Sequence, residues 1–254
     1  MKSFLRLLFC FFAYTSLAFA ENISYEIEFH GNKDFSSSLL LEQMDLPEEF
    51  GVLEEARRDF ILKLARGGLE DFYITEGYFS SKIFMDAPLL KDGLLIYAVR
   101  IFEGPKYVFR NTFFSIEGTD LMQSQKFLLT VQSGDPFHFE HIAEDLQRLR
   151  ALYRKHGFLH LRMDHNELID TVAKSVDVTY AIITGTPVRM ASLKTFSLRA
   201  RDSSLLERGL TDSNWFASLW ETKQGDTVDG NYLSDFRTKL LGTQIFSQIT
   251  VTTP

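Results

Sequence analysis

The alternation of hydrophobic and polar residues along the chain predicts both strands and helices. Hydrophobic residues from Val176 to Ile182 alternate with polar or small ones, which is typical of a half-buried strand. In residues 139–156 the hydrophobic positions instead recur at spacings of three and four, which predicts a helix with one apolar face. Gly157 follows at a position where glycine commonly ends a helix.

The same reading over the whole chain predicts three copies of a β-α-α-β-β unit. The first copy has expected strands at 25–29, 79–85 and 94–102, with helices at 35–44 and 53–75. The second has expected strands at 107–116, 158–163 and 176–182, with helices at 121–129 and 139–156. The third has expected strands at 188–198 and 246–251, with helices at 202–209 and 232–241. It holds no counterpart of the last strand, so an incomplete third domain is expected.

Three short motifs recur at matching places in these copies. One ends the long helices, at Glu76-Gly77-Tyr78-Phe79, His156-Gly157-Phe158-Leu159 and Gly242-Thr243-Gln244-Ile245-Phe246. Another ends the last strand, at Phe102-Glu103-Gly104-Pro105 and Thr184-Gly185-Thr186-Pro187, and a third precedes the long helix, at Gly134-Asp135 and Gly225-Asp226. Because a repeat of about 80 residues can form a small domain, we predict an α+β tandem array of three domains over 21–105, 106–187 and 188–254.

The first 20 residues have the features of a cleaved export signal. Lys2 and Arg6 precede an apolar run over 7–17, and Ala18-Phe19-Ala20 fits the small-x-small cleavage rule. A buried N-terminal helix is the alternative. Cys10, the only cysteine, lies in this segment. The expected mature chain then has 25 basic and 34 acidic residues, a net charge of −9, which disfavours binding to nucleic acid and to anionic lipid surfaces.

The recurring motifs resemble those of the polypeptide-transport-associated (POTRA) domain over residues 24–254. The matching positions are Gly77, Tyr78, Glu103, Gly104, Pro105, Gly134, Asp135, Gly157, Phe158, Gly225, Asp226 and Phe246. Three such domains behind a signal look similar to the periplasmic arm of the translocation and assembly module branch of the outer-membrane barrel assembly superfamily. The chain departs from that pattern because it ends before a barrel and before the last strand of the third domain. The first copy also lacks the Gly-Asp motif.

The resemblance implies a non-enzymatic periplasmic scaffold that needs no cofactor and contacts unfolded outer-membrane or secreted proteins and other envelope assembly proteins. A β-barrel in cis, if present in a longer protein, would associate it with the outer membrane. We expect the strand after each Gly-aromatic motif to lie at a sheet edge, where an extended client can add a strand. The predicted protein-binding residues are Phe79, Ser81, Ile83, Met85, Leu159, Leu161 and Met163. These edges could instead be solvent-facing or covered by a neighbouring domain.

Other functions have weaker support in the sequence. A free periplasmic adaptor that docks envelope proteins is the alternative scaffold reading. Metal binding is a further hypothesis, because the second copy contains five histidines: His138, His141, His156, His160 and His165. They do not form the closed ligand set that a structural metal needs. Surface histidines explain them better. Trp215 and Trp220 fit either a partner surface or core packing. The paired carboxylates at 48–49 and 54–55 lie at helix starts, where the helix dipole favours them.

Overall fold

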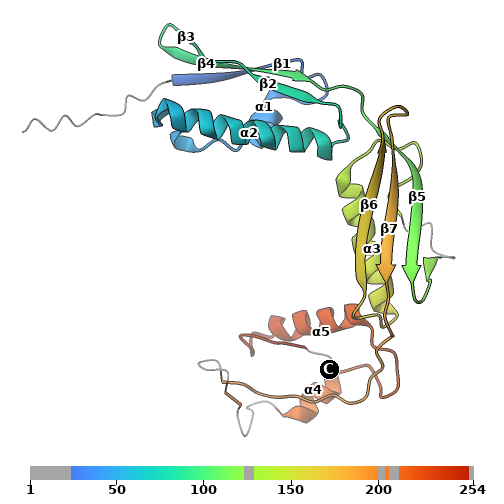
Figure 1. Cartoon of the computed structure of the whole chain (residues 1–254). Coiled ribbons are helices and arrows are strands. Elements are labelled where there is room, and N and C mark those ends of the chain that lie inside the picture. The colour runs from blue at the N-terminus through green and yellow to red at the C-terminus, as the bar shows by residue number, and fades with distance from the viewer. Residues whose placement is uncertain (1–23, 123–128, 200–203, 206–211, 252–254) are drawn as a thin grey trace, which may run out of the picture. The chain divides into compact units, whose positions relative to one another are not determined.

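The computed structural model describes residues 24–122, 129–199, 204–205 and 212–251, and these divide into two compact units (Figure 1). The first unit consists of the described residues up to Tyr73 together with Ser80–Gly104. The second consists of Ile74–Phe79 and the described residues from Pro105 onward. The predicted signal at 1–20 with Cys10, most of the predicted helix at 121–129, and most of the one at 202–209 lie outside the described residues.

The first unit is a sheet covered on one face by helices (Figure 1). Its strand order is β1-β4-β2, with β1 (Ser24–His30) parallel and β2 (Lys82–Met85) antiparallel to the central β4 (Leu94–Phe102). The helices are α1 (Ser37–Gln43), η1 (Glu48–Val52) and α2 (Glu55–Thr75). Buried side chains from both layers form the core, including Leu40, Phe50, Leu69, Tyr73, Tyr97 and Val99.

A short strand, β3 (Leu89–Lys91), also pairs with β4 and was not predicted. It forms a hairpin with β4 through Asp92 and Gly93, which have φ angles of +51° and +81°. The Asp-Gly pair, a strong signal for a tight hairpin turn, was present in the sequence and could have revealed this strand.

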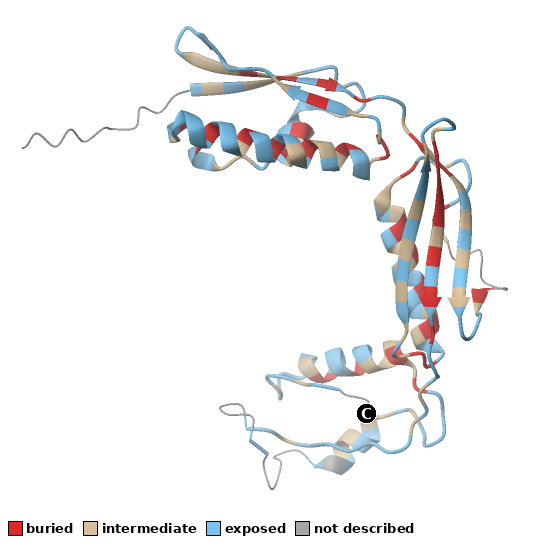
Figure 2. Cartoon of the chain, viewed as in Figure 1, coloured by how far each residue is buried: buried red, intermediate tan, exposed pale blue. Residues whose placement is uncertain are grey.

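The second unit contains a three-stranded sheet of the same design. Its order is β5-β7-β6, with β5 (Val108–Glu117) parallel and β6 (Arg162–Asp170) antiparallel to the central β7 (Ser175–Ile183). Helix α3 (Phe139–Lys155) packs on one face of this sheet and supplies Ile142, Leu149 and Tyr153 to its core. Figure 2 shows β7 mostly buried, whereas β6 alternates between exposed and intermediate residues, as expected for a central and an edge strand.

A bulge in β5 positions a charged cluster at the end of this sheet. The β5–β7 register shifts between Phe109 and Thr112. Arg110 lies in this bulge, so its side chain can extend beyond the paired strands. Its guanidinium contacts Asp177 at 2.6 Å and Asp170 at 2.9 Å. The hydrogen bonds from Arg110 hold the pKa of Asp177 below its ordinary value, although burial opposes this shift.

The predicted strands at 188–198 and 246–251 are wrong, since neither segment forms a strand in the described structure. Only single bridges occur here, between Arg189 and Thr227 and between Leu198 and Leu205. The reason lies in the topology of the other two copies, where both outer strands pair with the last strand of the copy and not with each other. Among the described residues from 188 onward no strand takes that central position, so the two segments have no strand to pair with there.

Two helices of the third copy are described. Helix α5 (Gly230–Gly242) corresponds to the helix predicted at 232–241, and α4 (Ser213–Leu219) contains Trp215. The ring of Trp220 packs against Tyr232 and Phe236 of α5 at centroid distances of 5.3 and 5.0 Å. Trp220 therefore packs within the second unit.

Candidate protein-binding edges and repeat junctions

Strand β2 is an edge of its sheet, because among the described residues it pairs only with β4. Just beyond the strand, the amide of Asp86 donates to the carbonyl oxygen of Ala98 at 3.0 Å. The amide and carbonyl groups of successive residues point to opposite sides of an antiparallel strand. Those of Lys82 and Phe84 therefore point toward β4, as the amide of Asp86 does. The amide and carbonyl groups of Ile83 and Met85 therefore point away from β4, toward the free edge.

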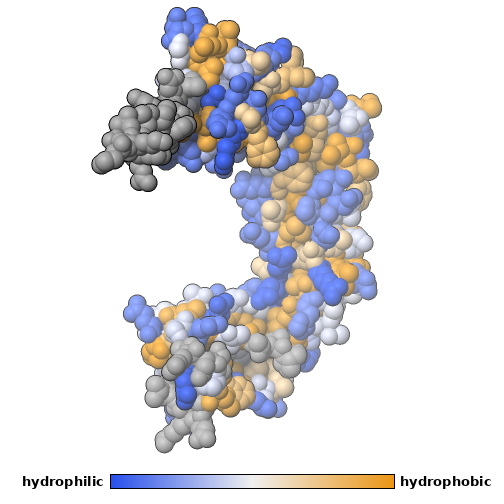
Figure 3. Space-filling model, turned by 60° about the vertical axis from the view of Figure 1, so that its left-hand side comes forward, coloured by the Kyte–Doolittle hydropathy of each residue, from blue (hydrophilic) through white to orange (hydrophobic). Residues whose placement is uncertain are grey.

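The outer face of the sheet beside this edge carries exposed aromatic side chains. Phe84 is 46% exposed and Phe102 is 60% exposed, and their ring centroids lie 6.0 Å apart across the two strands. Ile83 points the other way and is buried in the core. On the face visible in Figure 3, hydrophobic residues stand in separate groups among hydrophilic ones. The β2 edge thus combines free backbone groups with a small apolar surface.

Strand β6 is the corresponding edge of the second sheet and pairs with β7 over nine residues. It is more polar than β2. The backbone amide of His165 donates to Asp164 Oδ1 at 2.8 Å, and His165 Nε2 lies 2.9 Å from Glu167 Oε1. Charged side chains of this kind protect an edge against unwanted strand addition. Exposed apolar residues occur only toward the end of this strand and in the turn after it, at Leu168, Ile169 and Val172.

The predicted edge residues are not all in strands. Ile83, Met85 and Met163 lie in β2 and β6. Ser81 immediately precedes β2 and Leu161 immediately precedes β6, whereas Phe79 and Leu159 lie three residues before these strands begin. The chain turns at 79–80 and 159–160 before each strand begins. Phe79 belongs to the second unit, where its ring packs 5.1 Å from Tyr107 and 5.0 Å from Phe137. Leu161 is half-buried against the second core, and Leu159 lies next to Gly230.

The Gly-aromatic motif at Gly77 anchors the start of the second copy. Within the second unit, the carbonyl of Gly77 accepts a hydrogen bond from the amide of Tyr107 at 2.9 Å, and the carbonyl of Tyr107 accepts from Phe137 at 2.9 Å. Gly77 has a φ angle of +90°, and a Cβ atom there would lie 2.7 Å from the carbonyl oxygen of Phe137. Both the conformation and the close approach require glycine. The next residue, Tyr78, is buried, with Lys106 Nζ 5.5 Å above its ring.

Gly157 makes the same arrangement one copy later. Its carbonyl accepts from the amide of Val188 at 2.8 Å, and the carbonyl of Val188 accepts from Val228 at 3.0 Å. Gly157 has a φ angle of +87°, and a Cβ atom would lie 2.4 Å from Thr227 Cγ2. Phe158 is buried in the second core. The matching bonds show that the motif makes the same backbone pairing at both places within the second unit.

The Gly-Asp motif completes each junction. The amide of Gly134 donates to the carbonyl of Phe109 at 2.8 Å, and the amide of Phe109 donates to the carbonyl of Asp135 at 2.9 Å. The equivalent bonds join Gly225 and Asp226 to Met190 at 2.7 and 2.8 Å. In both places the motif pairs a segment near the start of the repeat with the turn before the long helix, so its role in the structure is architectural. In the third copy Phe246 contacts Phe216 of α4 at a centroid distance of 5.5 Å.

Glu103 of the Glu-Gly-Pro motif is a buried acceptor in the first unit. Its Oε1 accepts from the amides of Lys33 at 2.9 Å and Asp34 at 3.1 Å, and from the Tyr73 hydroxyl at 3.0 Å. In the second copy the buried Thr184 takes the place of Glu103, and its Oγ1 accepts from the amide of Thr119 at 3.1 Å. The motif therefore ties the loop after the first strand to the end of the central strand. Gly104 has a φ angle of +73°, and Pro105 begins the second unit.

The histidine-rich region contains a charged cluster at the first junction. His138 Nδ1 lies 2.9 Å from Glu76 Oε2, its Nε2 lies 3.2 Å from Lys106 Nζ, and its ring centroid lies 5.2 Å from that of His141. Partial burial and the Lys106 ammonium lower the pKa of His138, against the opposing effect of Glu76. In the described part of the chain, no three histidine, cysteine, aspartate or glutamate side chains are grouped closely enough to hold a metal ion.

Comparisons with known proteins bear on the fold. No protein-family model and no curated protein sequence matches the chain. A crystal structure of Haemophilus influenzae BamA POTRA domains 3–5 matches with a TM-score of 0.54 and 18% identity, covering 90% of this chain and 88% of that one. The chain has the POTRA fold.

Two cyanobacterial structures match this chain less well. POTRA domains 1–3 of Anabaena Omp85 align at 14% identity over 90% of this chain and 87% of that one, with a TM-score of 0.35. The N-terminal domain of Thermosynechococcus elongatus Omp85 aligns at 15% identity over 65% and 67%, with a TM-score of 0.30. The fold assignment therefore rests on the Haemophilus structure. Across the described residues of this chain, no helix is both long and apolar enough to cross a bilayer.

Proposed function

We propose that this chain is a periplasmic scaffold for outer-membrane protein assembly or secretion, which holds extended clients or partner proteins by strand addition at its sheet edges. The observation that carries the proposal is the free β2 edge, where the backbone groups of Ile83 and Met85 point outward beside the exposed rings of Phe84 and Phe102. The POTRA fold supports the same role, since the matched structures are domains of BamA and Omp85 proteins.

The proposed organisation follows the recurring motifs. A cleaved signal over 1–20 would export three POTRA-like domains, at 21–105, 106–187 and 188–254, related to the translocation and assembly module branch. The equivalent hydrogen bonds at Gly77 and Gly157 support this repeat. A β-barrel in cis or other envelope assembly proteins would be the partners of the scaffold.

The proposed contact is weak and little dependent on client sequence. Strand addition uses backbone groups that every client offers, and alternate side chains of the client meet the sheet surface. Each added hydrogen bond contributes only about 0.5–1.5 kcal/mol net, and β2 is four residues long. A short edge therefore gives a transient complex, as a scaffold that passes its clients onward requires.

A photo-crosslinking experiment tests the role of the edge. A photoreactive amino acid replaces Phe84 in the chain without residues 1–20, and crosslinking to a urea-unfolded barrel precursor is measured. Met85→Pro removes one outward amide but no β2–β4 bond, because the amide of Met85 points away from β4. We expect the crosslinked yield to fall roughly threefold or more.

Met85→Ala is the matched control, since it shortens the same side chain and keeps the amide. It should crosslink nearly as well as the parent chain, and circular dichroism should show the same fold for both variants. Equal crosslinking by Met85→Pro and Met85→Ala would refute strand addition at β2.

A further inference from the structure

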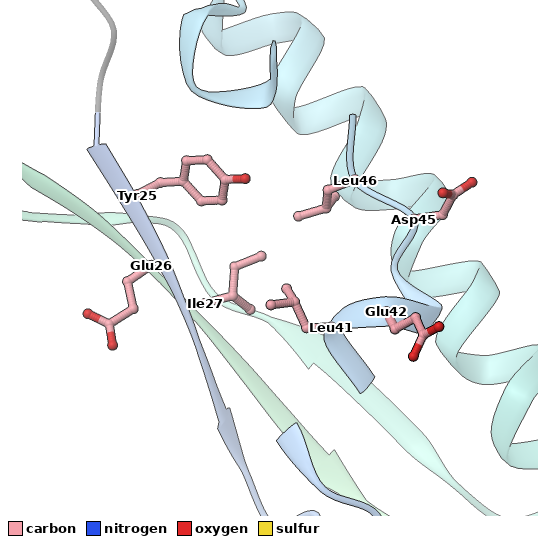
Figure 4. Close-up of a pocket in the computed structure, with 7 residues that line it drawn as sticks. All are labelled: Tyr25, Glu26, Ile27, Leu41, Glu42, Asp45 and Leu46. Atoms are coloured by element: carbon pink, nitrogen blue, oxygen red, sulfur yellow. The ribbon is translucent and has the colours of Figure 1, made fainter. Parts of the chain in front are cut away.

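The first unit has an open groove on the side of the sheet opposite β2. It lies between β1 and α1, has a volume of about 580 Å³, and is lined by Tyr25, Glu26, Ile27, Leu41, Glu42, Asp45 and Leu46. In Figure 4, Tyr25 and Ile27 project from the strand toward Leu41 and Leu46, whereas Glu26 points to the other side. Pockets for small molecules commonly have volumes of about 300–1,000 Å³, so a groove of this volume has room for one bulky side chain.

The groove adjoins a free backbone edge. Among the described residues β1 pairs only with β4, so its other side remains unpaired. In a parallel ladder every second residue directs both its amide and its carbonyl to the same side. Strand β1 therefore offers a row of donors and acceptors along the wall of the groove.

The packing of α1 leaves apolar surface uncovered in the groove. Leu40 and Met44 of this helical region are buried, but Leu41 between them is 45% exposed. The helix ends at Gln43, and Asp45 then takes a φ angle of +45° that turns the chain away. Leu41 consequently faces the half-buried Tyr25 and Ile27 with open space between them (Figure 4).

The charged residues that line the groove are all acidic. Residues 41–55 contain six aspartates and glutamates and no lysine or arginine, and β1 also lacks both basic residues. Within the described structure, no basic side chain forms an ion pair with Glu26, Glu42 or Asp45. Glu42 and Asp45 lie at the rim on the helix side of the groove (Figure 4), where their carboxylates are available to a cation from outside the chain.

We propose that this groove binds an extended segment of a partner protein that aligns along β1, inserts one bulky apolar side chain between Tyr25, Ile27 and Leu41, and carries flanking lysine or arginine. The free edge selects an extended backbone, the lining selects the apolar side chain, and the carboxylates select the positive charge. This site is separate from the proposed β2 contact and selects a partner by sequence, which backbone pairing at β2 does not.

Fluorescence anisotropy with labelled nonapeptides tests the proposal on the chain without residues 1–20. The probe is Lys-Thr-Val-Thr-Phe-Thr-Val-Thr-Lys, and its counterpart has glutamate in place of both lysines. We expect the lysine peptide to bind and the glutamate peptide to bind at least roughly tenfold more weakly. The affinity of the lysine peptide should also fall with added salt, because the charges at the rim of the groove are solvent-exposed.

Two variants locate this binding. Glu42→Gln together with Asp45→Asn should weaken binding of the lysine peptide roughly three- to tenfold. Asparagine is chosen at position 45 because it tolerates the positive φ angle there. Leu41→Glu places a charge in the apolar groove and should weaken both peptides at least roughly tenfold. Leu64→Glu is the matched control, because Leu64 is a 61% exposed leucine on α2. This variant should leave the affinity for both peptides unchanged.

Several outcomes would overturn the inference. They are equal binding of the two peptides, no binding by the parent chain, or unchanged affinity in Leu41→Glu. Dimerisation of the chain that Leu41→Glu abolishes, without peptide binding, would assign the groove to a second copy instead. Met85→Pro should leave peptide binding unchanged. The proposal for this groove and the proposal for the β2 edge can therefore be refuted independently of each other.

Discussion

The hydroxyl of Tyr73 donates a hydrogen bond to Glu103 Oε1 at 3.0 Å, which joins the end of α2 to the end of β4. The same carboxylate oxygen accepts from the amides of Lys33 and Asp34 in the loop after β1. One buried side chain thus connects three segments that are 30 to 70 residues apart. Because buried donors are costly when they lose their acceptor, this link should be important for the stability of the first unit.

Substitution of Glu103 tests that link. Glu103→Ala removes the acceptor of three donors and should lower the free energy of opening of the first unit by about 2–4 kcal/mol. Tyr73→Phe removes one donor and should cost about 1–2 kcal/mol. Amide hydrogen exchange of β1, β4 and α2, followed by mass spectrometry, measures both effects. A loss in Glu103→Ala no larger than that in Tyr73→Phe would contradict the shared-acceptor role.

The junction glycines should tolerate no side chain. Gly77→Ala and Gly157→Ala each combine a positive φ angle with a Cβ contact below 3 Å, so each should destabilise the second unit by at least about 2 kcal/mol. Gly67→Ala is the control, because Gly67 lies in α2 with nothing within 4 Å of the added Cβ.

This control should stabilise the first unit by about 0.5–1 kcal/mol, since alanine favours the helix more than glycine does. Urea denaturation monitored by fluorescence, together with hydrogen exchange, provides the comparison. If the three alanine variants behaved alike, the junction geometry would not explain the recurrence of these glycines.

His138 should make the second unit sensitive to mild acid. Its pKa in the folded chain is below the ordinary value of 6.5, chiefly through burial and then through Lys106. The unfolded chain therefore binds the proton more tightly, so the stability due to neutral His138 is complete above about pH 6.5 and is lost as pH falls through the lowered pKa. His138→Gln should flatten this dependence.

The measurement is the urea midpoint of the second unit at intervals from pH 7.5 to pH 5, compared between the parent chain and His138→Gln. NMR titration of the His138 ring would give the pKa directly. A ring that titrates above pH 6.5 would reverse the sign and disprove the prediction.

The sequence by itself determined the local elements and their repetition. Apolar spacing is a local property, so α2, α3, α5, β4 and β7 were predicted close to their observed bounds. The recurring glycines were visible for the same reason, since a positive φ angle strongly favours glycine at a fixed place in the chain, as at Gly77 and Gly157. The α+β class followed from these patterns, and the expectation of edge strands followed from the resemblance of the motifs to those of POTRA domains.

Only the tertiary structure decided what those patterns do. Periodicity does not say which strand is central, and that choice explains why 188–198 and 246–251 form no strands. It also does not show that Phe79 turns into the second core, or that Glu103 meets Tyr73. The outward amides of β2 and the groove beside β1 depend on pairing between distant segments. Such pairing arises from long-range packing, which spacing along the chain does not encode.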